Sequence, residues 1–168
     1  KEWQEGGPTL LWSYEGIGQG YASVSVVDGM IYTTGINEDN QETLFAIDNK
    51  GKLQWKKEYG QGWIGGYPGT RTTPTVDSEH LYIMSGHGRL ACFNRETSDL
   101  IWKVDTLEKY EGKILNWGIA ESVIIVDDKV ICTPGGQDAT VVALDKMTGK
   151  TIWTTKGLSE HSAYCSPV

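Results

Sequence analysis

The sequence lacks the features that mark several large classes of protein. Its 168 residues carry a formal net charge of −7 and no basic stripe, which argues against a nucleic-acid-binding surface. No apolar run approaches the length of a membrane span, and no signal-peptide pattern is present. Lysines and arginines are scattered among turn-like segments, as expected of a solvated surface.

Motifs for metal binding and catalysis are also missing. The three cysteines, Cys92, Cys132 and Cys165, lie apart, and no Cys-x-x-Cys or Cys/His cluster has zinc-site spacing. Cys92 and Cys132 have apolar neighbours, which favours buried free thiols. No Ser-His-Asp set or paired-carboxylate spacing indicates a hydrolase. We therefore expect no metal site and assign no catalytic residue.

The sequence instead contains one hairpin pattern three times. In residues 141–153 a short apolar strand runs into Asp145, a polar turn follows, and a second strand closes on Trp153. Aspartate and threonine side chains stabilise such turns by bonding the local backbone. Residues 44–55 and 90–102 repeat the pattern. The closing tryptophans recur at intervals of 43, 47 and 51 residues, which is typical of a structural repeat with loop insertions. They are Trp12, Trp55, Trp102 and Trp153.

A second pattern precedes each hairpin. Residues 26–32, 75–82 and 125–131 each contain a strand, a turn built on aspartate and another strand. Together the two patterns predict units of four short antiparallel strands, and therefore an all-β protein made of β-propeller blades. A hydroxyl residue precedes each unit and recurs near the end of the chain, at Ser23, Thr73, Ser122 and Ser166.

We expect residues 1–168 to form one partial β-propeller with about three full blades. Three blades cannot close a ring, because propellers need roughly four to eight. The chain is therefore expected to be a segment of a longer propeller, or to close by association with a second copy. Residues 1–8 are expected to be an irregular lead-in. The expected blades are approximately residues 20–55, 70–102 and 118–153, with residues 9–14 and 162–168 in flanking blades.

The combined pattern resembles the pyrroloquinoline-quinone-like (PQQ-like) β-propeller repeat. It reads Ser/Thr-Pro-x-Val-Asp-Gly and then Ala-Leu-Asp-x-x-Thr-Gly-x-x-x-Trp, and it covers nearly the whole chain, from about Leu10 to Val168. Quinoprotein alcohol dehydrogenases and BamB-type outer-membrane assembly lipoproteins share this repeat. The resemblance implies that each closing tryptophan docks between blades, and that the protein is periplasmic or otherwise exported. Because enzymes and scaffolds share the repeat, it indicates fold more specifically than function.

Candidate ligand-binding residues come from the connections between blades. Residues 59–73 are rich in glycine and aromatic residues, and Arg71 can clamp an anion. Glu121 falls in an apolar innermost strand, where an unpaired carboxylate is costly. It is expected either to face the axial channel or to pair with Arg71, in which case Tyr67 would only cap its blade. The expected lining of the axial funnel is Tyr21, Tyr67, Arg71, Trp117, Glu121 and Tyr164.

Two functions from different classes are compatible with this resemblance. The first is a non-catalytic scaffold, without a cofactor, that binds a protein, peptide or small polar ligand through its loops and axial funnel. The second is a quinoprotein alcohol or sugar dehydrogenase that uses PQQ and calcium. Dehydrogenases of that family carry a vicinal Cys-Cys pair, an aspartate base and calcium ligands, none of which can be matched to positions in this sequence. The sequence therefore favours the scaffold.

Overall fold

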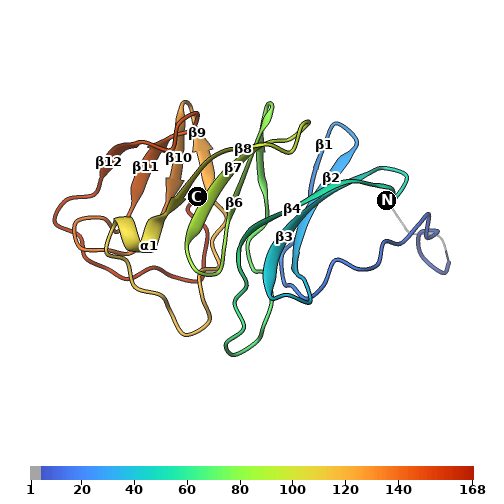
Figure 1. The fold of residues 1–168 in the computed structure, drawn as a ribbon, viewed down its shortest axis with the longest axis horizontal. Coiled ribbons are helices and arrows are strands. Elements are labelled where there is room, and N and C mark those ends of the chain that lie inside the picture. The colour runs from blue at the N-terminus through green and yellow to red at the C-terminus, as the bar shows by residue number, and fades with distance from the viewer. Residues whose placement is uncertain (1–4) are drawn as a thin grey trace.

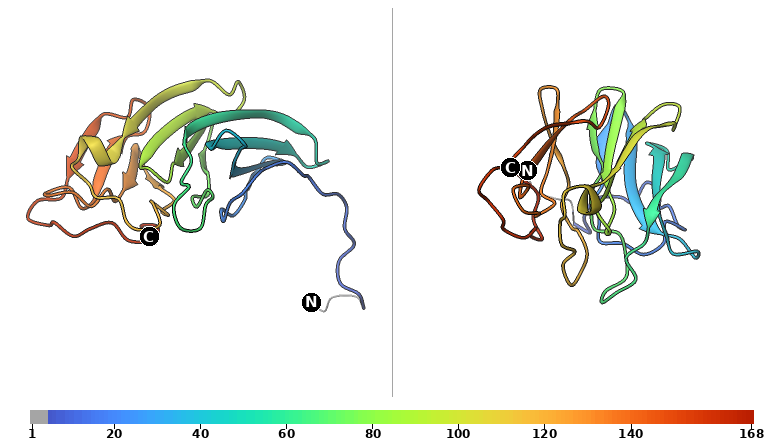
Figure 2. Two further views of the ribbon diagram at one scale, coloured as in Figure 1. Left: turned by 60° about the horizontal axis from the view of Figure 1, so that its bottom comes forward. Right: turned by 60° about the vertical axis from the view of Figure 1, so that its left-hand side comes forward.

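The computed structural model describes residues 5–168 and consists almost entirely of antiparallel sheet (Figure 1). Three four-stranded sheets succeed one another along an arc (Figure 2), and each forms one propeller blade. Within every sheet the strands are neighbours in chain order. The all-β prediction is confirmed. No helix within residues 5–168 is long and apolar enough to cross a membrane.

The blades have the same plan but strands of different length. The first sheet contains β1 (Ser25–Val27), β2 (Met30–Ile36), β3 (Gln41–Asp48) and β4 (Leu53–Gln61). The second contains β5 (Thr75–Asp77), β6 (His80–Met84), β7 (Arg89–Asn94) and β8 (Leu100–Asp105). The third contains β9 (Ile124–Val126), β10 (Lys129–Cys132), β11 (Val142–Asp145) and β12 (Thr151–Thr154). One helical turn, α1 (Thr106–Lys109), follows β8.

The hairpin turns form through the side chains that the sequence pattern identified. Asp145 Oδ1 accepts hydrogen bonds from the backbone N–H groups of Met147 and Thr148, at 3.1 and 2.8 Å. Equivalent bonds run to Asp48 in the first blade and to Asn94 in the second. Such side-chain-to-backbone bonds fix the reversal of the chain, so turn chemistry sets where the third strand of each blade ends.

Two expected strands are absent. Residues 9–14 form no strand, and Leu10 and Leu11 are 79% and 86% exposed. Residues 162–168 form none either. A strand needs a neighbour for its backbone hydrogen bonds, and no described sheet pairs with these segments. The first blade is expected from about residue 20, but its innermost strand, β1, begins only at Ser25. Of the expected lead-in at residues 1–8, the first four residues lie outside the described part.

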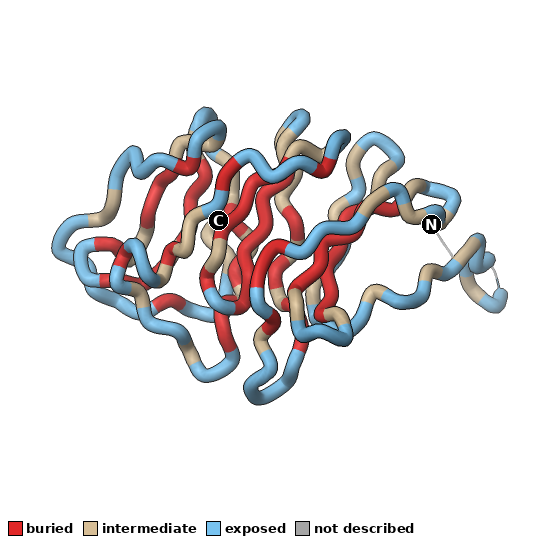
Figure 3. The backbone as a smooth tube through the Cα atoms, viewed as in Figure 1, coloured by how far each residue is buried: buried red, intermediate tan, exposed pale blue. Residues whose placement is uncertain are grey.

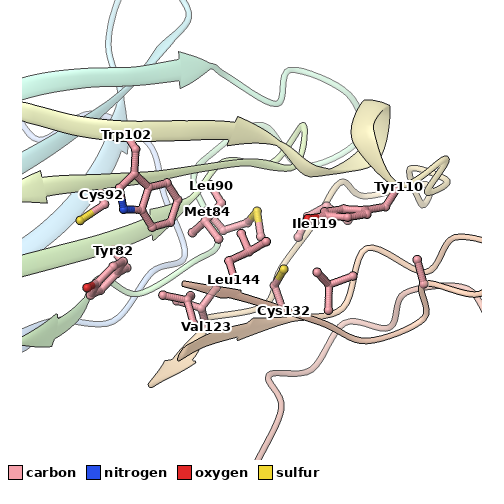
Figure 4. Packing of buried hydrophobic residues seen from close by; sticks show 13 residues of the cluster. Tyr82, Met84, Leu90, Cys92, Trp102, Tyr110, Ile119, Val123, Cys132 and Leu144 are labelled. Atoms are coloured by element: carbon pink, nitrogen blue, oxygen red, sulfur yellow. The ribbon is translucent and has the colours of Figure 1, made fainter. Parts of the chain in front are cut away.

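The core lies in the second and third strands of each blade, where buried residues concentrate (Figure 3). Between the second and third blades it forms one continuous cluster, in which Trp102, Tyr82 and Met84 meet Leu144 and Val123 (Figure 4). The blades are therefore joined by an apolar interface, which is how neighbouring units of a repeat protein stabilise one another.

Three of the four closing tryptophans dock onto the turn of the following blade. The indole N–H of Trp102 donates to the carbonyl of Lys146 at 2.9 Å, and that of Trp55 donates to Arg95 at 3.0 Å. Trp12 makes the same bond to Asn49 at 2.9 Å, although its own segment is not a strand. The ring of Trp102 lies so close to Gly149 that a Cβ there would approach within 2.7 Å of the ring. The fourth closing tryptophan, Trp153, is 41% exposed.

An ion pair accompanies each docked tryptophan between described blades. Lys146 Nζ lies 2.7 Å from Asp77 Oδ2, and Arg95 Nη2 lies 2.6 Å from Asp28 Oδ2. Each cation is the residue whose carbonyl accepts the indole bond, so one turn position serves both contacts. Sequence analysis missed these pairs. The available signal was a basic residue directly after the aspartate or asparagine of the hairpin.

At the axis, hydroxyl side chains join the innermost segments in series. Ser23 N–H donates to Thr73 Oγ1 at 3.0 Å, and Thr73 N–H donates to Ser122 Oγ at 2.9 Å. Ser122 N–H donates in turn to Ser166 Oγ at 2.8 Å. The recurring hydroxyl residues therefore fix the spacing of consecutive blades at the axis, as the tryptophans do further out.

Replacing Trp102 tests the docking of the blades. Trp102→Ala should lower the free energy of unfolding by about 3–5 kcal/mol, because it empties a buried site and leaves the Lys146 carbonyl without its donor. Ile101→Ala, at a 41% exposed position on the same strand, should change it by less than about 0.5 kcal/mol. Urea denaturation measures both, and equal effects of the two substitutions would contradict this account of the interface.

Candidate functional site

Five of the six expected funnel residues surround one open cavity of about 440 Å³. They are contributed by the segments that precede the innermost strand of successive units. Their role in binding stays a prediction, but the structure brings their side chains together. We call this surface the aromatic mouth and define it by Tyr21, Tyr67, Arg71, Trp117, Ala120 and Tyr164.

Arg71 organises the loop that carries Tyr67. Its Nη1 donates to the carbonyl of Gly69 at 2.6 Å, and its Nη2 donates to the carbonyls of Gly66, at 3.3 Å, and Tyr67. These bonds hold Tyr67 at a φ of +59°, a left-handed conformation that is rare for a bulky residue. Tyr67 is 69% exposed, so the strained loop presents its ring to solvent at the rim of the mouth.

Tyr21 is joined to the same loop. Its backbone N–H donates to the carbonyl of Thr70 at 2.7 Å. The guanidinium carbon of Arg71 lies 5.6 Å from the centroid of the Tyr21 ring, within the range of a cation–π contact. The connections that precede the first and second blades therefore form one wall.

Trp117 and Tyr164 form a second pair of residues that line the cavity. Their ring centroids are 5.1 Å apart at an interplanar angle of 38°, and the backbone N–H of Trp117 donates to Tyr164 Oη at 3.3 Å. Two residues further on, the N–H of Ile119 donates to the carbonyl of Gly86 in the second blade at 2.8 Å. This bond ties the Trp117 segment to the neighbouring blade.

Glu121 does not line the mouth, and the expected ion pair with Arg71 does not form. Glu121 is 1% exposed, and its carboxylate accepts bonds from the N–H of Thr133, at 2.8 Å, and from the Thr133 hydroxyl. Successive side chains of an extended segment point to opposite faces, so Ala120 faces the cavity and Glu121 faces the blade. Burial raises the pKa of Glu121, opposed by its bonds from Thr133.

Arg71 is thus the charged member of an otherwise apolar surface. Partial burial lowers the pKa of its guanidinium, while nearby tyrosines and Glu42 oppose that shift. An arginine stays protonated at neutral pH despite such a shift. The mouth can therefore offer flat aromatic faces, hydrogen-bond donors and one positive charge to a ligand.

Sequence analysis missed a second buried carboxylate, Glu42. It is 0% exposed, and its Oε1 accepts a bond from the N–H of Gly86 in the next blade at 2.9 Å. Among the described residues, its Oε2 and the hydroxyl of Tyr59 have no hydrogen-bond partner. Burial raises the pKa of Glu42 to about 7, against the opposing effect of the Gly86 bond. A glutamate at the start of an apolar strand was the available signal.

The cysteine thiols and the acidic side chains do not cluster in the part of the chain that the structure describes. Cys92 and Cys132 are buried and Cys165 is exposed, all with free thiols. Burial raises the pKa of Cys92 to about 12. Across residues 5–168, no three His, Cys, Asp or Glu side chains gather in a way that could hold a metal ion.

Comparison with known proteins shows which proteins carry a similar repeat. The family model described as "Outer membrane protein assembly factor BamB" matches residues 40–168. The BamB of Pseudomonas aeruginosa PAO1 is 32% identical over 73 residues, which cover 44% of this chain and 18% of that protein. The aligned part therefore spans less than a fifth of that relative.

Solved structures share the architecture. BamB from Moraxella catarrhalis superposes with a TM-score of 0.61 at 24% identity, over 89% of this chain and 40% of that one. The quinohemoprotein alcohol dehydrogenase from Comamonas testosteroni gives a TM-score of 0.64 at 22% identity, over 86% of this chain and 22% of that one. At these identities the likeness shows a common propeller fold.

Substituting Glu42 tests the pH dependence that its burial creates. The folded-state pKa of about 7 lies above the ordinary 4.5, so this group favours folding most below pH 4.5 and loses that contribution as pH rises through 7. Glu42→Gln keeps an acceptor for Gly86 and carries no charge. It should exceed the wild type in unfolding free energy by on the order of 1–3 kcal/mol at pH 8, with a much smaller difference at pH 5.

Denaturation with urea at both pH values measures this effect. Glu58→Gln, at an exposed position on β4, is the matched control and should have a similar small effect at pH 5 and pH 8. A difference between Glu42→Gln and wild type that does not change between pH 5 and pH 8 would contradict this account, because Glu42 would then be ionised in the folded protein over the same pH range as in the unfolded chain.

Proposed function

The chain belongs to the family of the outer membrane protein assembly factor BamB, and we propose that it is a non-catalytic scaffold that binds a protein partner through the aromatic mouth. The proposal includes export to the periplasm and a partner that takes part in outer-membrane assembly. The observation that carries it is the gathering of four exposed aromatic side chains and one arginine around a single cavity.

The composition and exposure of the mouth support a role in protein binding. Tyrosine, tryptophan and arginine are the residues most enriched at interface hot spots. Large apolar side chains gathered at one exposed surface favour an interaction site over simple solvation. The four aromatic members are 63%, 69%, 49% and 43% exposed, for Tyr21, Tyr67, Trp117 and Tyr164 respectively.

The structure supports the dehydrogenase alternative less well. PQQ carries several carboxylates, so a site for it needs several free cationic donors. Among residues 5–168, Arg71 is the one charged residue that lines the mouth, and its guanidinium already donates to three backbone carbonyls of its own loop. The residues present therefore do not fit the quinone cofactor, and we derive no reaction through it.

Site-specific crosslinking in cells that produce the protein tests the scaffold function. With the photoreactive residue p-benzoylphenylalanine at Tyr67, a discrete protein adduct should form, and mass spectrometry should identify an outer-membrane assembly component. The same probe at Ile101, exposed on β8, is the control and should give no such adduct. Trp117→Ala should remove the Tyr67 adduct. Equal adducts at both positions, or none at Tyr67, would count against the proposal.

A further inference from the structure

We propose that the aromatic mouth recognises an extended, proline-rich peptide segment with an acidic residue beside its prolines. This inference rests on the proposed function, because it specifies which part of a protein partner enters the mouth. Three properties of the described side chains lead to it: the ring faces, the available hydrogen-bond donors, and the single positive charge.

The ring faces suit a chain of rigid apolar rings. Trp117 and Tyr164 form one adjoining pair, and Tyr21 and Tyr67 line the same cavity. Proline-rich segments adopt an extended helix with three residues per turn, and their pyrrolidine rings dock into aromatic-lined grooves. Such a segment loses little conformational freedom on binding, because it is extended before it binds.

Within the described part of the chain, the mouth has hydrogen-bond donors that a ligand can use. Within residues 5–168, the indole N–H of Trp117 and the hydroxyls of Tyr21 and Tyr67 bond to no other residue, so they are available to a ligand. The hydroxyl of Tyr164 accepts from the backbone N–H of Trp117 and retains its own hydrogen as a donor.

Three backbone carbonyls beside the mouth already accept hydrogen bonds. They belong to Gly66, Tyr67 and Gly69 and receive the bonds of Arg71, while Glu121 is turned into the blade. An ordinary peptide would bring a backbone N–H at every residue, and each one that is buried without an acceptor is unfavourable. Proline has no N–H, and its extended helix leaves every carbonyl free to accept. A segment that is rich in carbonyls and poor in N–H groups therefore suits this surface.

The charge of Arg71 selects the flanking residue. Its guanidinium lies over Tyr21, and no acidic side chain of the described part of the chain lines the mouth to neutralise it. A carboxylate next to the docked prolines gains an attractive interaction, whereas a lysine at that position is repelled. The net charge of the whole chain is −7, which would by itself repel an acidic ligand, so the preference for a carboxylate comes from Arg71 locally.

Fluorescence anisotropy with labelled peptides tests the inference on the purified protein. The probe is a fluorescein-labelled Glu-Pro-Pro-Ala-Pro-Pro peptide, compared with one that has alanine for every proline and one that has lysine for glutamate. The proline-rich acidic peptide should bind saturably, and both comparison peptides should bind at least about fivefold more weakly.

Variants of the protein locate the binding surface. Tyr67→Ala and Trp117→Ala should each weaken binding of the acidic proline-rich peptide by at least about fivefold, since both side chains are exposed members of the mouth. Ile64→Ala is the matched control. Ile64 is 57% exposed in the same connection but does not line the cavity, so binding should not change.

The outcomes separate this inference from the proposed function. Equal binding of the proline and alanine peptides, or binding that is unaffected by Tyr67→Ala and Trp117→Ala, would overturn the proline-rich ligand. If the Tyr67 crosslink to an assembly component still formed, the scaffold function would stand with a different kind of partner surface. Loss of that crosslink together with peptide binding would overturn both.

Discussion

The structure depends on the docking of one indole onto the turn of the following blade. A four-stranded blade cannot bury both of its faces alone, so its stability comes from the interface with its neighbour. At each described interface a closing tryptophan places its ring against that turn and its N–H on a fixed carbonyl. A basic residue at the same turn position pairs with an aspartate of the preceding blade. The apolar contact supplies most of the stability, whereas the hydrogen bond and ion pair fix the orientation.

The aromatic mouth is a consequence of this docking. Its residues lie in connections between neighbouring blades. The positions of these blades are fixed by the docked tryptophans further out and by the series of hydroxyl bonds at the axis. The connections then bond to one another across the blade boundaries, as Tyr21 does to Thr70 and Ile119 does to Gly86. Aromatic side chains are therefore presented on a preorganised frame, which lowers the entropy cost of binding.

The sequence was sufficient for the fold and for most of the cavity lining, because both follow from repeated positions. It was not sufficient where a shift of one position along the chain decides which side chain faces the cavity. Glu121 and Ala120 are adjacent, and only the three-dimensional course of the segment shows which one faces the axis. The partners of Arg71 are backbone carbonyls of its own loop, which pairing charges along the sequence cannot reveal. Glu42 was missed because its partner, Gly86, belongs to another blade.

Hydrogen exchange at the Ile119 amide, in the wild type and in Trp102→Ala, tests most directly whether blade docking builds the mouth. This amide donates to the Gly86 carbonyl across the interface that Trp102 stabilises. The account predicts that Trp102→Ala greatly accelerates its exchange, while amides paired between β2 and β3 in the first blade remain protected. Unchanged protection of Ile119 would contradict the account, because the loops would then hold their arrangement independently of the docked tryptophan.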